Sequence, residues 1–264
     1  MPIDITARFN FTLPEPTDFL LQFEAASLPE QAILRAHTEL SSTEHFVRVA
    51  AQDGIGERIW VRAAGRFEVN YSAQAEVRRS LPELASLAQL DPHLLPGETV
   101  QYLMSSAYCA VDRLYPFTEA EFAGTSGGER VLAIRDWIAD HFTYEPGSTS
   151  RTTAIDSFVE RRGVCRDYAH VLVTLVRASS IPARYVSTFA PRVEPQDFHA
   201  VAEVFLADPS GQGGTWQLID ATGMADPAEM VKIGVGRDAA DVSFLTCFSA
   251  CDFGGLEISV GRPG

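Results

Sequence analysis

Short alternations of apolar and polar residues occupy the first hundred positions of the chain. Apolar side chains recur at every second residue within 3–5, 9–11, 19–23, 47–49, 59–61 and 67–71. This period of two places them on one face of a β-strand, and Pro, Gly, Asp and Asn separate the segments. No period of 3.6 residues is sustained there. We therefore predict a small antiparallel sheet or barrel that supplies a wall or a partner surface.

The stretch from residue 80 to residue 100 shows neither period. Pro82, Pro92 and Pro96 interrupt it, which predicts a loop-rich connector with at most one short helix. We place the domain boundary shortly after this connector. Residues 1–115 are predicted to form the N-terminal β domain, and residues 116–264 the second domain.

The second domain is predicted to contain helices first and an antiparallel sheet after them. Apolar residues at steps of three and four, together with their end signals, predict helices over 128–145, 153–162 and 165–180. Thr152 or Thr153 is the expected N-cap of the second helix, and Gly163 its expected end. Beyond Pro182, alternation returns and predicts strands over 184–189, 199–206 and 216–220. The fold class is α+β.

The charge of the chain restricts its partners. It carries 21 Lys and Arg against 35 Asp and Glu residues, a formal charge of −14. Such a surface repels phosphates, so we expect no nucleic-acid partner and no anionic membrane partner. No segment reaches the roughly 18 apolar residues of a spanning helix, and the first residues lack the pattern of a signal peptide. We expect a cytoplasmic protein, and the oligomeric state stays open.

Cys165 is the candidate nucleophile. It follows Gly163 and Val164 at the predicted start of a helix, where free N–H groups and the helix dipole favour an anion such as a thiolate. Arg161, Arg162 and Arg166 are expected to add positive charge nearby, whereas Asp167 acts against them.

Two histidines are candidates for the proton carrier that a thiolate requires. Five helical steps of about 100° put His170 roughly 140° around the axis from Cys165, so we expect His170 to be structural. His199 begins the predicted strand 199–206 and can face a cleft. Asp220 ends the following strand.

The turn at 208–214 predicts that these two strands form a hairpin. If Leu206 pairs with Thr215, Asp220 lies opposite Val201 and is a diagonal neighbour of His199 on the same face. A slip of one residue would move Asp220 to the other face. The predicted register therefore yields a nucleophile, a base and an orienting carboxylate for acyl transfer through a thioester.

We expect each of the three side chains to have one role. Cys165 attacks the carbonyl carbon, His199 carries the proton, and Asp220 holds the imidazole. The backbone N–H of Cys165 is one oxyanion donor, and the sequence identifies no second donor.

The remaining signals are assigned no catalytic role. The spacing of Cys247 and Cys251 lacks further ligands, so no metal site and no cofactor are predicted. Cys109 is expected in the core. Arg237 is expected to form a salt-bridged turn with Asp238 and Asp241. Glu203 is left open between a partner of His199 and a solvated charge.

Several segments resemble the transglutaminase-like superfamily, in particular a bacterial branch described as cysteine proteases. They are 106–114, 162–170, 181–186, 198–200, 219–222 and 235–242. The family's catalytic Cys, His and Asp match Cys165, His199 and Asp220. The family usually has Trp and Pro where this chain has Val201 and Ala221, and the first difference is expected to reshape the cleft beside His199.

The resemblance implies a papain-like core preceded by a β domain, and an enzyme acting on amide or peptide bonds. We expect a peptide or protein substrate and hydrolysis as a cysteine protease or amidase. The alternatives are a protein-glutamine amine transferase that crosslinks proteins, or a catalytically inactive peptide-binding module of the same fold.

Overall fold

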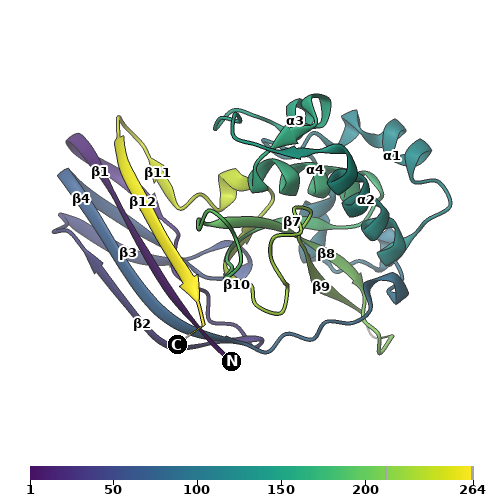
Figure 1. Ribbon diagram of the computed structural model, residues 1–264, viewed down its shortest axis with the longest axis horizontal. Coiled ribbons are helices and arrows are strands. Elements are labelled where there is room, and N and C mark those ends of the chain that lie inside the picture. Colours follow the sequence, from purple (N-terminus) through teal and green to yellow (C-terminus); the bar gives the residue numbers. More distant parts are fainter. Residues whose placement is uncertain (212, 263–264) are drawn as a thin grey trace.

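The computed structural model describes residues 1–211 and 213–262, which form two antiparallel sheets and a helical layer (Figure 1). The six strands of the first sheet are β1 (Pro2–Leu21), β2 (Gln31–Leu40), β3 (His45–Ala50), β4 (Glu57–Val77), β11 (Leu245–Cys247) and β12 (Asp252–Gly261). The long strands β1 and β4 are neighbours. β2 and β3 pair with the free edge of β4, and β11 and β12 pair with the free edge of β1.

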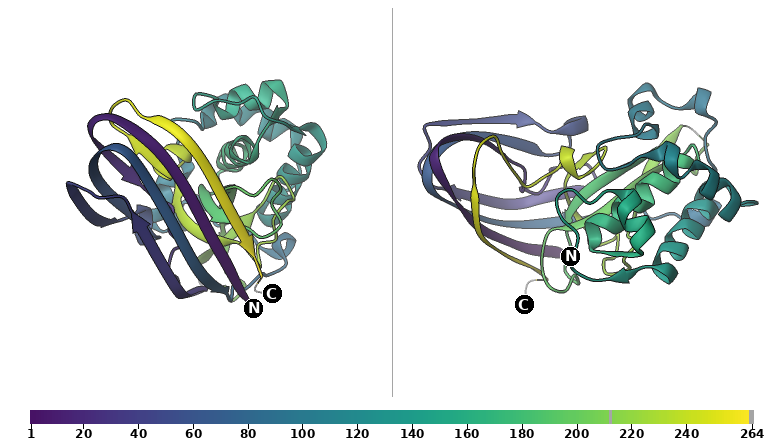
Figure 2. Two further views of the ribbon diagram at one scale, coloured as in Figure 1. Left: turned by 60° about the vertical axis from the view of Figure 1, so that its left-hand side comes forward. Right: turned by 90° about the horizontal axis from the view of Figure 1, so that it is seen from above.

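The C-terminal strands return to the first sheet, which the domain division predicted at residue 115 did not include. β11 and β12 leave the second domain and complete the first sheet, so that the two ends of the described chain lie close together (Figures 1 and 2). Their pairing covers the edge of β1, which would otherwise present unpaired backbone groups. Ile258 and Val260 alternate into the core of that sheet. The sequence shows the alternation of β12, but it does not show that the strand pairs with β1 at the other end of the chain.

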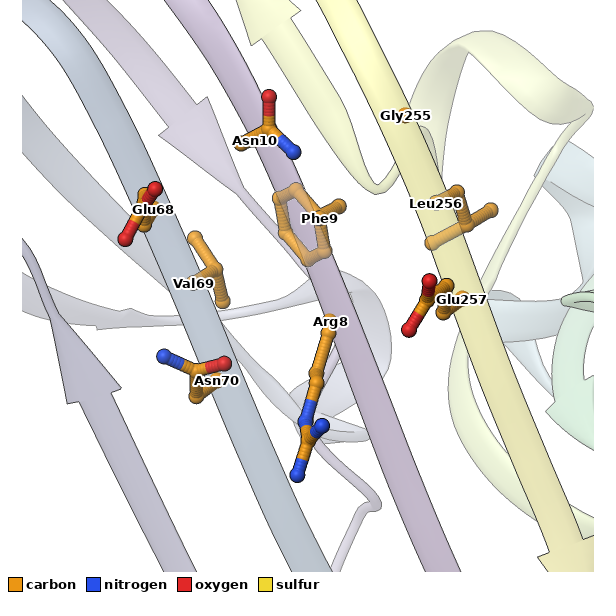
Figure 3. Close-up of a pocket in the computed structure, with 9 residues that line it drawn as sticks. All are labelled: Arg8, Phe9, Asn10, Glu68, Val69, Asn70, Gly255, Leu256 and Glu257. Atoms are coloured by element: carbon orange, nitrogen blue, oxygen red, sulfur yellow. The ribbon is translucent and has the colours of Figure 1, made fainter.

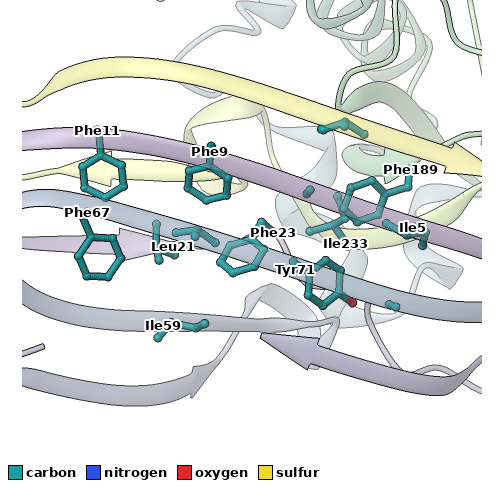
Figure 4. Packing of buried hydrophobic residues seen from close by; sticks show 14 of the residues in the cluster. Ile5, Phe9, Phe11, Leu21, Phe23, Ile59, Phe67, Tyr71, Phe189 and Ile233 are labelled. Carbon is teal, nitrogen blue, oxygen red and sulfur yellow. The ribbon is translucent and has the colours of Figure 1, made fainter. Parts of the chain in front are cut away.

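The period-two pattern of the first domain builds one apolar layer. Phe9, Phe11 and Phe67 project from neighbouring strands onto the same side of the sheet (Figure 4). Phe189 and Ile233, which come from the second sheet, pack in the same layer beside the aromatic residues of the first. The two sheets therefore share a core, and the position of one is tied to that of the other.

The second sheet has the strand order β10–β7–β8–β9. Its strands are β7 (Ala183–Phe189), β8 (His199–Ala207), β9 (Gly214–Ile219) and β10 (Val231–Gly236). The helices are α1 (Tyr115–Glu121), α2 (Gly127–His141), α3 (Ala154–Glu160) and α4 (Cys165–Ala178). α4 packs on β7 and β8, with α2 and α3 against its outer side (Figure 1). The three predicted helices and three predicted strands are confirmed within a few residues.

The end of α3 differs from the prediction. The N-cap of α3 is Thr153, one of the two residues predicted for this role, and it forms a capping box with Asp156. The helix ends at Arg161, which adopts the left-handed conformation at φ 57°, rather than at Gly163. Gly163 belongs to β6 (Arg162–Gly163), which pairs in parallel with β5 (Thr143–Tyr144).

The connector between residues 80 and 103 contains only short 3₁₀ turns, as the prolines predicted. These turns are Leu84–Ser86, Pro92–Leu94 and Gly97–Leu103. In the predicted turn 208–214, residue 212 lies outside the described residues. No helix in the described part of the chain has the length and apolar character needed to cross a membrane.

Candidate active site

Cys165 occupies the first position of α4, where its N–H has no acceptor within the helix. Gly163 makes the approach to this position, with φ at 154°. A Cβ on Gly163 would lie 2.5 Å from the Cβ of Asp167, so no larger residue fits. The Asp167 carboxylate accepts the Val164 N–H at 2.8 Å and fixes the turn. Asp167 thus caps the helix that carries the thiol.

Asp220 and His199 are brought together by the predicted register of the hairpin. Leu206 pairs with Thr215, as expected, and Ala202 with Ile219 at the last paired position. Asp220 follows directly, and its Oδ2 lies 3.0 Å from Nε2 of His199. The register therefore places the carboxylate on the imidazole face of the sheet.

The carboxylate of Asp220 is held by more than the histidine. The backbone N–H groups of Thr222 and Ala225 donate to it at 2.8 and 2.9 Å, and the Thr222 hydroxyl at 2.7 Å. Burial by itself raises the pKa of Asp220, but these hydrogen bonds and His199 lower it overall. Asp220 is consequently a fixed anion behind the imidazole.

The second nitrogen of His199 is left free for the thiol. His199 is 1% exposed, and its Nδ1 makes no ordinary hydrogen bond within the described residues. The Cys165 thiol lies beside the ring and is 4.0 Å from the Phe198 carbonyl. Burial lowers the pKa of His199, but the hydrogen bond to Asp220 and the nearby Cys165 thiol outweigh it and raise that pKa to about 9. The arrangement therefore favours the charged imidazolium beside the sulfur.

Tyr144 is a further residue at this thiol that the sequence did not reveal. Strand pairing sets it opposite Gly163, two residues before Cys165, and its ring centroid is 5.8 Å from that of Tyr168. Its hydroxyl lies near both the backbone and the thiol of Cys165. Burial and the thiol raise the pKa of Tyr144 to about 12. A two-residue strand has no periodicity, so the pattern gave no signal for it.

His170 takes the structural place expected of it. Its Nε2 accepts a hydrogen bond from the Ala239 N–H at 3.1 Å, and its ring stacks on Tyr108 at 5.1 Å. Burial lowers the pKa of His170 to about 3, so the ring is neutral. It fixes the segment around residue 239 against α4.

Two of the three arginines expected to act on the thiol are engaged elsewhere. The Arg161 guanidinium lies over the rings of Trp137 and Phe158, at 4.3 and 4.2 Å from their centroids. Arg162 pairs with Glu145 and Glu160 at the surface. The expectation failed because both arginines precede α4: Arg161 follows the end of α3 and Arg162 lies in β6.

Glu203 is neither a partner of His199 nor a solvated charge. It is 1% exposed and pairs with Arg184 at 2.7 Å and with Lys232. Burial raises the pKa of Glu203, but these two cations outweigh it and bring it to about 2.

The other predicted non-catalytic residues lie as expected. Cys109 is buried, and burial raises the pKa of its thiol to about 11. Arg237 pairs with Asp241 at 2.9 Å, while Asp238 caps the Ala240 N–H. These residues are structural.

Two hollows differ in their chemistry. One, of about 320 Å³, lies over the polar face of the first sheet, where Arg8, Asn10, Glu68 and Glu257 project (Figure 3). Its described lining contains no cysteine or histidine. The other, of about 480 Å³, is lined by Phe198 and other residues next to Cys165. The second hollow is therefore the one that adjoins the reactive groups.

Known proteins share this fold and this site region. Residues 117–221 match the model of the transglutaminase-like superfamily. A solved protein of Cytophaga hutchinsonii, named "Putative Cysteine Protease", is 30% identical, with 99% of this chain and 90% of that chain covered at a TM-score of 0.88. The chain belongs to the transglutaminase-like superfamily. Its fold is a transglutaminase-like core with an N-terminal β domain, as predicted, and both findings support a thiol-dependent enzyme.

Mycobacterial relatives of the superfamily core are uncharacterized proteins. One from Mycobacterium leprae is 32% identical over 118 residues, and one from Mycobacterium tuberculosis is 34% identical over 125 residues. The matched part spans 42% of the first and 38% of the second relative.

Proposed function

We propose that the protein hydrolyses an amide or peptide bond through a thioester on Cys165. One observation carries this proposal: His199 is hydrogen-bonded to Asp220 through Nε2 and presents a buried, unpartnered Nδ1 at the Cys165 thiol. A histidine with one oriented and one free nitrogen is what proton transfer to and from a thiol requires. A module that only bound peptide would have no need of this arrangement.

Acylation begins with the thiolate of Cys165 and the imidazolium of His199. The sulfur attacks the carbonyl carbon, and the resulting oxyanion collapses as the C–N bond breaks. His199 donates its Nδ1 proton to the departing amine. Water then attacks the thioester while His199 takes one of its protons, the C–S bond breaks, and the acid leaves. Asp220 keeps the ring oriented and stabilises its charged form throughout.

Two donors are available for the oxyanion. The N–H of Cys165 points out of the start of α4, and the Tyr144 hydroxyl lies at the same N–H and thiol. A carbonyl oxygen placed between this hydroxyl and the Cys165 N–H would accept hydrogen bonds from both groups. Tyr144 therefore fills the second donor role that the sequence left vacant.

The pH dependence of alkylation at Cys165 tests the proposal. Iodoacetamide labelling, resolved by peptide mass, should stay rapid well below the ~8.5 pKa of a free thiol and lose this behaviour in His199→Ala. The exposed His93→Ala is the matched control and should behave as the parent. Labelling that follows an ordinary thiol titration and ignores His199 would overturn the proposal and favour the peptide-binding module.

A second assay separates hydrolysis from amine transfer. The parent protein is offered a labelled amine and a glutamine-bearing protein, and incorporation is followed by mass. We expect the acid product and no labelled acceptor. Label on the acceptor that depends on Cys165 would establish the transferase instead.

A further inference from the structure

The cavity of about 480 Å³ next to the thiol is built from both sheets. Tyr185 of β7 and Arg166 of α4 line it from the core, while Leu245 and Thr246 of β11 line it from the first sheet. β11 is held in place by pairing with β1, in which Leu21 lies opposite Leu245. The first sheet thereby supplies one wall of a hollow beside the active site.

The walls are mainly apolar and aromatic. Phe198 and Phe244 stack with ring centroids 5.0 Å apart, and Val242 is buried beside them. Phe244 also packs on Phe9 of the first sheet at 5.4 Å, which fixes its ring. Cavities of 300–1,000 Å³ with such walls and a few polar groups are typical binding sites for organic groups.

The cavity adjoins the residues that pack around the Cys165 sulfur. Cys165 packs in one cluster with Tyr185, Val242 and Ala239, all of which line the cavity. The carbonyl of Phe198, another lining residue, faces the thiol. A carbonyl carbon bonded to the sulfur would therefore lie next to the cavity. Because His199 does not line the cavity, we assign the leaving amine to the side of the His199 proton and the acyl side to the cavity.

We propose that this cavity is an acyl-side subsite that receives a large apolar side chain, aromatic above all, next to the scissile bond. This deepens the proposed function and rests on it. Stacking and edge contacts with Phe198 and Phe244 would favour an aromatic ring there. Among the described lining residues, Arg166 alone carries charge, so a lysine side chain of similar reach is disfavoured. The substrate class is therefore a peptide or amide with a bulky apolar residue at its acyl end.

Chloromethyl ketones of acetyl-phenylalanine, acetyl-glycine and acetyl-lysine test the subsite. Each places its side chain on the acyl side and alkylates the thiolate with loss of chloride. We expect the phenylalanine reagent to label Cys165 at least about tenfold faster than the glycine and lysine reagents. Ser243→Trp, which introduces a large ring at the exposed rim of the cavity, should abolish the preference.

Controls separate the subsite from the chemistry. Ser259→Trp, on the exposed face of β12, should keep the preference and react with iodoacetamide as the parent does. Equal rates with all three ketones, together with His199-dependent iodoacetamide labelling, would overturn the subsite and leave the proposed function standing. Loss of His199 dependence with iodoacetamide would overturn both.

Discussion

Two buried polar groups share strand β8 and differ in what they leave unpaired. His199 begins the strand and Glu203 lies four residues along it, and each is 1% exposed. Both titrate away from their ordinary pKa, to about 9 and about 2. By burial and by shifted pKa alone, either would be a candidate functional group.

The difference lies in their partners. Glu203 meets Arg184 and Lys232, and these cations reach Asp53 and Glu30 at 2.8 and 2.9 Å in the first domain. Every charge there has a counter-charge, and the network joins the two domains. His199 keeps a free Nδ1 beside the Cys165 thiol. An unpartnered nitrogen beside a nucleophile, rather than burial or a shifted pKa, separates the candidate reactive group from the structural one.

The largest effect is expected from removing the charge of Glu203, the structural member of the pair. Glu203→Gln leaves Arg184 and Lys232 buried without their shared anion, so the free energy of unfolding should fall by about 3–5 kcal/mol. Urea unfolding measures this, with the exposed Glu257→Gln as the control. Alkylation of Cys165 at low temperature should be unchanged. A loss below about 1 kcal/mol would show that the network is not needed for stability.

The next effect compares the two buried histidines, whose pKa shifts have opposite signs. The pKa of His170, about 3, lies below the ordinary 6.5, so the unfolded chain binds the extra proton and stability should fall as pH drops from 6.5 toward 3. The pKa of His199, about 9, lies above 6.5, so stability should fall as pH rises from 6.5 to 9. A single titrating group gives a slope of at most about 1.4 kcal/mol per pH unit.

Urea unfolding across pH checks both slopes. His170→Gln should remove the fall in the free energy of unfolding below pH 6.5. His199→Gln should remove the fall above pH 6.5. If either variant flattened the opposite side, the assignment of charge to the two rings would be wrong.

A smaller effect concerns the orientation of the active-site imidazole. Asp220→Asn removes the anion that favours imidazolium, so the thiolate fraction at pH 6 should approach that of an ordinary thiol. Iodoacetamide labelling of Cys165 at pH 6 should slow about 100-fold and recover near pH 9. Asp252→Asn, at an exposed site, serves as the control. Unchanged labelling at pH 6 would remove Asp220 from the mechanism.

The smallest effect is expected at Tyr144. Loss of one oxyanion donor costs about 10²–10³ in an enclosed site, but Tyr144 is 37% exposed, so we expect Tyr144→Phe to weaken binding of acetyl-phenylalanine aldehyde about tenfold. The aldehyde forms a hemithioacetal oxyanion, whereas iodoacetamide forms none and should react as before. Tyr115→Phe is the exposed control. Equal loss with both reagents would mean that the hydroxyl acts on the thiol instead.

The sequence predicted those parts of the site that local rules determine. The turn after β8 set the register that brings Asp220 to His199, and the residues from Gly163 onward marked the start of the helix at Cys165. A register shift of one residue would have turned every side chain of β9 to the opposite face of the sheet, so the length of this short loop determines where Asp220 lies.

Long-range pairing was the part that the sequence did not reveal. The partner of β11 and β12 is β1, at the other end of the chain, and alternation does not say which edge a strand joins. Tyr144 lies in a strand too short to show a period. The ion pairing of Glu203 could not be predicted because its partner Lys232 lies in β10, which is not a sequence neighbour of β8.

The return of β11 to β1 has a consequence for the making of the protein. During synthesis the thiol, the histidine and the carboxylate all precede Leu245, so they leave the ribosome before the wall of the cavity exists. At ordinary rates of elongation this interval lasts on the order of seconds. A nascent or prematurely ended chain would carry these three residues without the wall that β11 adds to the proposed acyl-side cavity, so that β11 completes this cavity only after the residues around the thiol have been made.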